Sequence, residues 1–476
     1  MIHLVIVVCL VATWCARYCW RRRRLYECAR QRRGPLALPF VGNVIYLAGR
    51  SRDIFDKVFK FIAVFESPAP LWLGPHLFFV IWDSKNLKTV LNNQDCLEKS
   101  VFYKYVEDAI GRGLITHPVD KWKRHRKLIA PIFNRKTLES FVEVFYTRSQ
   151  TLTDQLIRSV SDDEVDVFGV FSSFAACVLM GSYRFPKLIA LTCIYRNRAK
   201  DVAYVRMNNV FYHFDCIFRL TSHAKKLDEA VNQIEIVIGG VMKKCLLMKE
   251  VPDHPTFLQK LIEASRDEQE FTETDLRDEI TTFLIGGNDT VTTTLSYVTT
   301  VLGMYPTVQE QIYSEVASTI GLTQPISYAD LCGLEYTERA IKETLRLFPP
   351  APCVSRKVLK DIRLENCIIP AGSSIAIAIM GLHRDPKVWP NPLEFDPDRF
   401  HRENEMDPYN WLPFSGGSRN CVAQRYAITL MKVVVASLVR RYRFSSSYKD
   451  VGAIKFEANL LLKPIDGFKV SVALRQ

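Results

Sequence analysis

One apolar stretch, from Asp275 to about Tyr305, limits which folds this chain can adopt more than any other part of the sequence. Thr272 and Thr274 are candidate N-caps and Pro306 follows the end, so the stretch is predicted to be one long helix. At ~1.5 Å per residue, such a helix is roughly 45 Å long, about the width of a domain. Because it is apolar on most faces, we expect it to cross the core of a large, mainly helical domain.

The middle of this predicted helix carries Gly286, Gly287, Asn288, Asp289 and Thr290 in direct succession. Two glycines inside a helix cost about 1 kcal/mol each, which suggests that something flat approaches the backbone there. An ionisable side chain in mid-core is also costly unless it has a partner or a chemical role. The alternative is a kinked helix in which Asp289 and Thr290 form only local hydrogen bonds.

A glycine-rich loop near the end of the chain precedes another apolar helical stretch. From Phe414 to Ala423 it follows the pattern F-x-x-G-x-R-x-C-x-A, with Gly417, Arg419 and Cys421 at the fixed positions. Glycine permits tight turns beside a flat cofactor, and the arginine can pair with an anionic group on that cofactor. A helix opening at the cysteine would favour the thiolate. The pattern therefore predicts an axial thiolate ligand of haem iron, and the alternative is a small buried side chain.

The loop resembles the haem-binding loop of the cytochrome P-450 monooxygenases, and the central motif resembles their oxygen-activation motif. The resemblance implies haem b with Cys421 as the axial ligand, and contacts to the haem from Phe414, Gly417, Gly286 and Gly287. Many mammalian members of the family-4 group have a glutamate where Gly286 stands, and it can bond covalently to the haem. The glycine predicts a haem without that link.

The same resemblance assigns proton delivery to bound oxygen to Thr290, with Asp289 relaying protons from solvent. Val291 stands where the family often has a second threonine or serine. Ala423 likewise stands where glycine is usual, a substitution that some members of the family tolerate.

Trp122 and Arg126 form a W-x-x-x-R pair on one helical face. By resemblance they would bind the haem propionates together with Arg356 and Arg419, because a guanidinium suits a carboxylate. The alternative is a basic, solvated helix, and His125 between them is expected to be structural. Neighbouring basic residues could steer an acidic electron donor, namely Lys121, Lys123, Arg124 and Lys127.

Glu343 and Arg346 form an E-x-x-R pair that lies ahead of Pro349 and 75 residues before Cys421. At a spacing of three they share a helix face, and buried charges need such pairing. In the family pattern Arg399 completes the trio and locks the cysteine loop; its alternative role is that of an ordinary surface arginine. Between these motifs, alternation from Leu364 to Ile379 predicts a small β-hairpin.

The amino terminus is nearly all apolar from Ile2 to Ala16, and four arginines begin at Arg21. Extended to Trp20, the segment is roughly 28 Å long as a helix, enough for a thin bilayer. The positive-inside rule then places the arginines and the body in the cytosol, with the anchor in the endoplasmic reticulum membrane. A cleaved signal peptide is the alternative, but its charge would precede the apolar run.

Three regions are predicted: a single-pass anchor at 1–20, a basic and proline-rich connector at 21–43, and a catalytic domain at 44–476. Hydrophobic residues make up 48% of the 476 residues, and we find no repeat or linker that would divide the chain after residue 50. More than half of the net charge of +12 lies between Arg17 and Arg33, beside the apolar segment, which argues against a nucleic-acid partner. The 13 cysteines are scattered, without a C-x-x-C pair, which favours a reducing compartment.

The sequence around Trp122 and the segment from Asn391 to Phe395 look most like the microsomal family-4 group, including its insect members. That group often hydroxylates fatty acids and related lipids. The stretch from Phe168 to Lys200 matches the pattern poorly and is short for the helices that roof the substrate cavity.

The resemblance implies a fold that is mainly α with a small β subdomain, and a monooxygenase acting on an apolar fatty acid, related lipid or xenobiotic. Electrons would come from NADPH through a reductase, with cytochrome b5 as a further candidate donor. The alternatives are a haem-dependent isomerase or dehydratase, and a non-catalytic haem protein.

Overall fold

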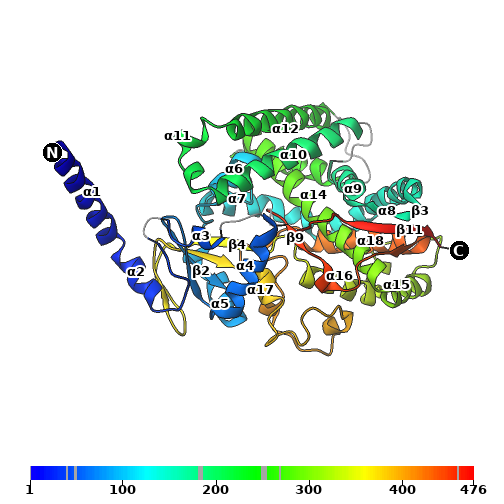
Figure 1. The fold of residues 1–476 in the computed structure, drawn as a ribbon. Coiled ribbons are helices and arrows are strands. Elements are labelled where there is room, and N and C mark those ends of the chain that lie inside the picture. Colours follow the sequence, from blue (N-terminus) through cyan, green and yellow to red (C-terminus); the bar gives the residue numbers. More distant parts are fainter. Residues whose placement is uncertain are drawn as a thin grey trace.

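The computed structural model describes residues 2–38, 41–47, 51–180, 186–247, 255–266, 270–457 and 460–475. In this part of the chain most residues are helical, and the strands form small sheets, so the expected mainly α fold is confirmed. The first helix, α1 (Ile2–Arg21), extends away from the body, and α2 (Arg23–Arg30) lies at the edge of the body with Cys28 and Ala29 buried (Figure 1). Within α1, His3–Arg21 is long and apolar enough to cross a membrane, judged by length and composition, and none of it is buried.

Short and medium helices build the first half of the body. They are α3 (Val44–Leu47), α4 (Ser51–Val64), α5 (Ser84–Leu91), α6 (Tyr103–Ile110), α7 (Val119–Ile129), α8 (Arg135–Leu156), α9 (Phe168–Met180) and α10 (Pro186–Asn208). The second half contains α11 (Asp215–Phe218), α12 (Ser222–Leu247), α13 (Phe257–Arg266), α14 (Glu273–Met304), α15 (Pro306–Thr319), α16 (Glu335–Leu347), α17 (Ile379–Leu382) and α18 (Gln424–Arg441).

The central helix α14 begins and ends where the sequence signals predict. Thr272 caps it in a capping box with Asp275, and Pro306 starts the next helix directly after Tyr305. Most of α14 is buried, although it is rich in threonine and serine. Several of these hydroxyls donate to the carbonyl four residues earlier, as Ser296 does to Thr292 at 2.8 Å, so they need no partner outside the helix.

The strands form a four-stranded sheet and three smaller ones. The larger sheet has the order β1 (Ala69–Leu73), β2 (His76–Ile81), β7 (Ser374–Ile377), β4 (Val354–Lys357). The three-stranded sheet has the order β3 (Ser161–Asp166), β11 (Lys469–Leu474), β8 (Tyr442–Ser445). The pairs are β5 (Ile362–Arg363) with β6 (Ile368–Ile369) and β9 (Phe456–Glu457) with β10 (Lys463–Pro464).

The predicted hairpin between Leu364 and Ile379 is wrong in its pairing. β6 pairs with β5, while β7 pairs in parallel with β2 and antiparallel with β4, so the turn at Gly372 joins two different sheets. Alternation of side chains shows that a segment is a strand, but it does not identify the neighbouring strand.

The roof of the molecule is formed by α10 and α12, which pack against each other above α14 (Figure 1). The sequence between Phe168 and Lys200 is short for a roof, yet α10 continues to Asn208 and α12 supplies a second long helix. Residues 181–185, between α9 and α10 in the sequence, lie outside the described residues.

Candidate active site

A cavity of about 1680 Å³ lies between α14, the roof helix α10 and the glycine-rich loop that carries Cys421. Its lining is mostly apolar, with Leu179, Phe283 and Val291 among the contributing side chains. Cavities for a single small ligand are usually about 300–1000 Å³, so this one has room for a large cofactor and a substrate together.

The loop on one wall is shaped by two residues with left-handed backbone. Gly417 has φ +67°, and a Cβ there would lie 1.9 Å from the carbonyl oxygen of Leu91, so only glycine fits. Ser415 also has a positive φ of 58°. The Cys421 amide donates to the Phe414 carbonyl at 2.9 Å, which closes the loop and turns the cysteine toward the cavity.

Helix α18 begins later than the sequence predicted, after Cys421 rather than at it. We expected a helix to open at the cysteine, but α18 begins at Gln424, and the dipole effect falls off beyond the terminal turn. Burial raises the pKa of the Cys421 thiol, and the Ala423 amide and Arg126 only partly offset that rise. The surface that Cys421 still exposes lines the cavity. A cation in the cavity would therefore be needed to hold the thiolate.

Cationic side chains gather beside this loop. Arg419 donates to the carbonyls of Leu97, at 2.6 Å, and His117. Arg126 donates to the carbonyl and side-chain oxygens of Asn420, both at 2.6 Å. Further members of the group around Trp122 are Arg356 and Lys99, and all of them line the cavity.

This cation group lacks a matching anion. Among the residues that the structure describes, we find no ion pair between these four cations and a carboxylate, and the Nε of Arg419 is buried without a hydrogen-bond partner. Burial and the neighbouring Arg356 lower the pKa of Arg419 to about 10. Burial, Arg356 and Arg419 also lower the pKa of Lys99. The group therefore fits a dianionic ligand, and the two propionates of haem b supply those charges.

The opposite wall of the cavity is the middle of α14. Gly286 and Gly287 both line the cavity, and a Cβ on Gly286 would lie 2.8 Å from the end of Ile115. Thr290 also lines it, and its hydroxyl donates to the Gly286 carbonyl at 2.8 Å. The glycines therefore add no side chain of their own at this point, where Ile115 and Leu179 pack closely against the helix.

Asp289 makes contacts that the sequence did not predict. Its carboxylate oxygens lie 2.9 Å from Arg196 and 2.6 Å from Lys200, both on α10, and all three side chains are buried. Burial alone would raise the pKa of Asp289, but Arg196 and Lys200 lower it overall, so the carboxylate is ionised. This triad joins the roof to α14 at the edge of the cavity.

Glu343, Arg346 and Arg399 lie together below the loop. Arg346 forms a bidentate pair with Glu343, with both contacts at 2.7 Å, and Arg399 Nε lies 3.5 Å from Glu343 Oε1. Arg346 also donates to the carbonyls of His383 and Pro392. The trio thus fastens α16 to the segment that leads into the cysteine loop.

Sequence reasoning missed four polar residues of the site: Lys99, Arg196, Lys200 and Asn420. Arg196 and Lys200 stand four residues apart, and this spacing on a helix could have flagged a common partner. For Lys99 and Asn420 no sequence signal was available. Of the basic residues of α7 that could steer an electron donor, Lys121 is half-buried and paired with Asp275. Lys123 and Lys127 are exposed.

Comparison with known proteins agrees with this geometry. The profile of the family described as Cytochrome P-450 matches residues 33–472. Cytochrome P-450 4c21 of Blattella germanica is 30% identical, with 93% of each chain covered. Cytochrome P-450 4X1 of Homo sapiens is 30% identical over 94% of this chain and 91% of its own length. Cytochrome P-450 4g15 of Drosophila melanogaster is 26% identical over 96% and 94%. These names confirm the predicted resemblance to the family-4 group.

Proposed function

The chain belongs to the cytochrome P-450 family, and from this premise we propose that it hydroxylates an apolar substrate of the fatty-acid, related-lipid or xenobiotic class. Its enzymatic class is that of a haem-thiolate monooxygenase, with haem b as cofactor. The observation that carries the proposal is the cavity itself. One wall carries Cys421 beside cationic side chains that form no ion pair among the described residues. The opposite wall carries the hydroxyl of Thr290 next to Gly286 and Gly287, and the rest of the lining is mostly apolar.

Haem b, when bound, supplies the activation of dioxygen, from which one atom enters the substrate and the other leaves as water. We assign Cys421 as its axial ligand and Trp122, Arg126, Arg356 and Arg419 to its propionates. The support is that, among the described residues, none of these three arginines forms an ion pair with a carboxylate. The apolar lining excludes water from the rest of the cavity, which favours an apolar substrate.

Thr290 is assigned to hold a proton on the side of α14 that faces the cavity. Its hydroxyl donates to Gly286, so its oxygen is left to accept a hydrogen bond from a second donor. Asp289 is assigned to proton supply, but both of its oxygens are engaged by Arg196 and Lys200. A proton can reach Thr290 from this carboxylate only after one of these ion pairs opens.

The electron donor is proposed to be an NADPH-dependent reductase, with cytochrome b5 as a second donor. The support is the exposed basic surface of α7, at Lys123, Arg124 and Lys127. α7 also carries Arg126, which is hydrogen-bonded to Asn420 beside the cysteine. Electrostatic steering by such a surface accelerates the encounter with an acidic partner.

The membrane arrangement is proposed from the amino-terminal helix. The anchor at 1–20 and the connector at 21–43 would hold the domain 44–476 on the cytosolic side of the endoplasmic reticulum membrane. The arginines that follow the apolar run support this orientation.

The reduced carbon monoxide difference spectrum tests the assignment of the axial ligand. We expect the spectrum that is typical of thiolate-ligated haem in the purified protein, and its loss in Cys421→Ala. A spectrum typical of nitrogen ligation in folded wild-type protein would contradict the assignment. NADPH consumption coupled to a hydroxylated product, with reductase present, separates a monooxygenase from an isomerase, a dehydratase or a passive haem carrier.

A further inference from the structure

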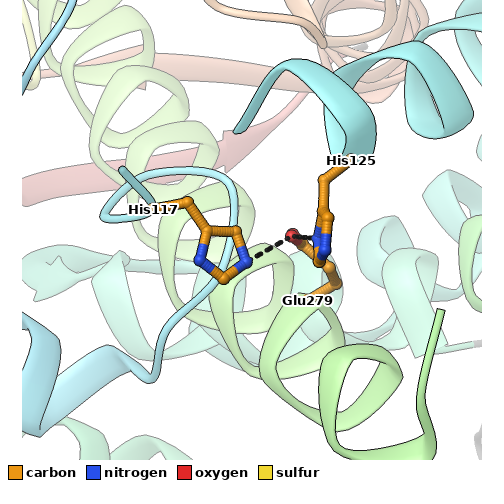
Figure 2. A group of neighbouring side chains, drawn as sticks. All are labelled: His117, His125 and Glu279. Carbon is orange, nitrogen blue, oxygen red and sulfur yellow. Dashed lines mark hydrogen bonds and ion pairs between the residues drawn. The ribbon is translucent and has the colours of Figure 1, made fainter. Parts of the chain in front are cut away.

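A second polar cluster lies where α7, α14 and the loop between α6 and α7 meet (Figure 2). His117 comes from the loop, His125 from α7 and Glu279 from α14. Their exposed fractions are 2%, 5% and 0%, and none of the three lines the large cavity. Three ionisable side chains from three segments have thus been taken out of water at one point, and the proposed reaction uses none of them.

The three side chains converge on a single oxygen. Glu279 Oε1 lies 2.7 Å from His125 Nδ1 and 3.6 Å from His117 Nε2. The three candidate ligand atoms lie within 4.8 Å of one another. Figure 2 shows both rings directed at the carboxylate. A local hydrogen-bond network would explain the contact of His125, but in the described part of the chain His117 Nε2 is buried without a hydrogen-bond partner.

Groups next to the three side chains hold them in position, as the residues around the ligands of a metal site do. Glu279 Oε2 accepts the Leu114 amide at 3.0 Å, which leaves Oε1 for the histidines. The second nitrogen of His125, Nε2, faces Asp275 Oδ1 at 3.9 Å. Asp275 is itself held by the amide and hydroxyl of Thr272, at 3.0 and 2.8 Å. A histidine that binds metal through one nitrogen commonly presents the other to a carboxylate in this way.

We propose that His117, His125 and Glu279 form a binding site for a divalent first-row transition ion, with Zn²⁺ as the best match. Two imidazole nitrogens and one carboxylate oxygen are a donor set that zinc accepts, with a fourth position left for water. Tetrahedral bonds of about 2.0–2.1 Å put ligand atoms roughly 3.3 Å apart. The two separations from Glu279 Oε1, 2.7 and 3.6 Å, lie on either side of that value, and all three ligand atoms lie within 4.8 Å of one another. From sequence alone, His125 was expected to be only structural.

The ion would fasten the loop from Gly113 to His117 against two helices. The loop already lies close to α14, because a Cβ on Gly113 would be 2.1 Å from the Thr282 hydroxyl. The His117 carbonyl accepts a hydrogen bond from Arg419, and Ile115 lines the cavity. Occupancy would thus stabilise the cavity wall and one propionate ligand. The site itself does not depend on the proposed oxygenation.

Zinc binding is measured on the purified, haem-loaded protein after treatment with a chelator. Zn²⁺ is added, the excess is removed by gel filtration, and the ratio of zinc to haem iron is determined by elemental analysis. We expect one zinc per iron in the wild-type protein, and at least tenfold weaker retention in His117→Asn. The asparagine variant should fold, because the nitrogen that it removes has no hydrogen-bond partner; haem content checks this. Equal retention in wild-type protein and His117→Asn, or no retention in either, would overturn the proposal.

The matched control is His401→Ala. His401 is exposed and also lies near a carboxylate, 3.7 Å from Glu403, so it shows what a surface histidine contributes. We expect its zinc content to equal that of the wild-type protein. Zinc K-edge absorption is selective for zinc and distinguishes nitrogen and oxygen ligands at ~2.0–2.1 Å from sulfur at ~2.3 Å. Because the chain has 13 cysteines, a spectrum dominated by sulfur would also overturn the proposal.

Discussion

Replacing Asp289 with asparagine would test how strongly the roof is held to the core. The amide keeps the shape of the side chain but leaves two buried cations, Arg196 and Lys200, without a countercharge. Removing one partner of a buried ion pair typically costs about 3–5 kcal/mol. Burial lowers the pKa of Lys200 despite the nearby carboxylate, so in the variant this lysine can lose its proton. We therefore expect a loss of about 3 kcal/mol, at the lower end of that range.

Lys200→Met is the matched comparison, because it leaves a balanced pair of Arg196 and Asp289. Its expected cost is about 1 kcal/mol or less, since the methionine retains most of the apolar contact. The assay is urea unfolding of the haem-loaded protein at pH 7, followed by haem absorbance and by far-ultraviolet circular dichroism. Equal losses for the two variants, or a loss under 1 kcal/mol for Asp289→Asn, would refute the reasoning.

The pH dependence of the same variant gives a second check. The folded-state pKa of Asp289 is lowered, so its contribution is complete above the unfolded pKa of about 3.9 and is lost as pH falls through the folded value. The Asp289 carboxylate should therefore cause no change in the unfolding free-energy difference between wild-type protein and Asp289→Asn from pH 7 to about pH 5, and a Lys200 neutralised in the variant would make the difference grow as pH falls. A difference that already shrinks between pH 7 and 6 would mean that another group is titrating.

Three further outcomes are expected. Burial lowers the pKa of His383 to about 3, so its stabilising contribution is complete above the unfolded pKa of about 6.5 and decreases as pH falls. Below pH 6.5, His383→Gln should therefore reduce the slope of the unfolding free energy against pH by up to ~1.4 kcal/mol per pH unit. Urea unfolding at several pH values measures this slope, and an unchanged slope would contradict the reasoning. Gly417→Ala should abolish haem incorporation, measured by absorbance, because a Cβ would meet the Leu91 carbonyl at 1.9 Å; normal haem content would refute the geometry. Because position 286 is glycine, acidified organic solvent should extract all of the haem from denatured protein, and haem retained on the chain would show another covalent link.

The fold was predictable where the signals are local to one segment. The capping residue Thr272 and the proline after Tyr305 defined α14 to within two residues at each end, because capping and proline chemistry act on the backbone directly. The pairing of β7 with β2 was not predictable, since the partner strand is nearly 300 residues away in sequence. Nothing in the alternation of β7 encodes that partner.

In the candidate site, too, residues close together in sequence were predictable and residues from distant segments were not. Cys421, Gly417 and Arg419 lie within five residues, so their common purpose is visible as a pattern. The partners of Asp289 come from α10, in a stretch that matches the family pattern poorly, and only the folded chain brings them together. Burial is equally hidden from sequence, and it raises the pKa of the Cys421 thiol.

The placement of Glu279, Gly286 and Asp289 on one helix has a mechanical consequence. The first contacts the loop before α7, the second borders the cavity, and the third carries the roof, all within roughly 15 Å of helix length. A helix over so short a span behaves as a stiff rod. Any tilt of α14 that moves the roof outward therefore also presses Glu279 against the loop before α7. Entry of a large substrate is thus coupled to strain at the contact between Glu279 and that loop.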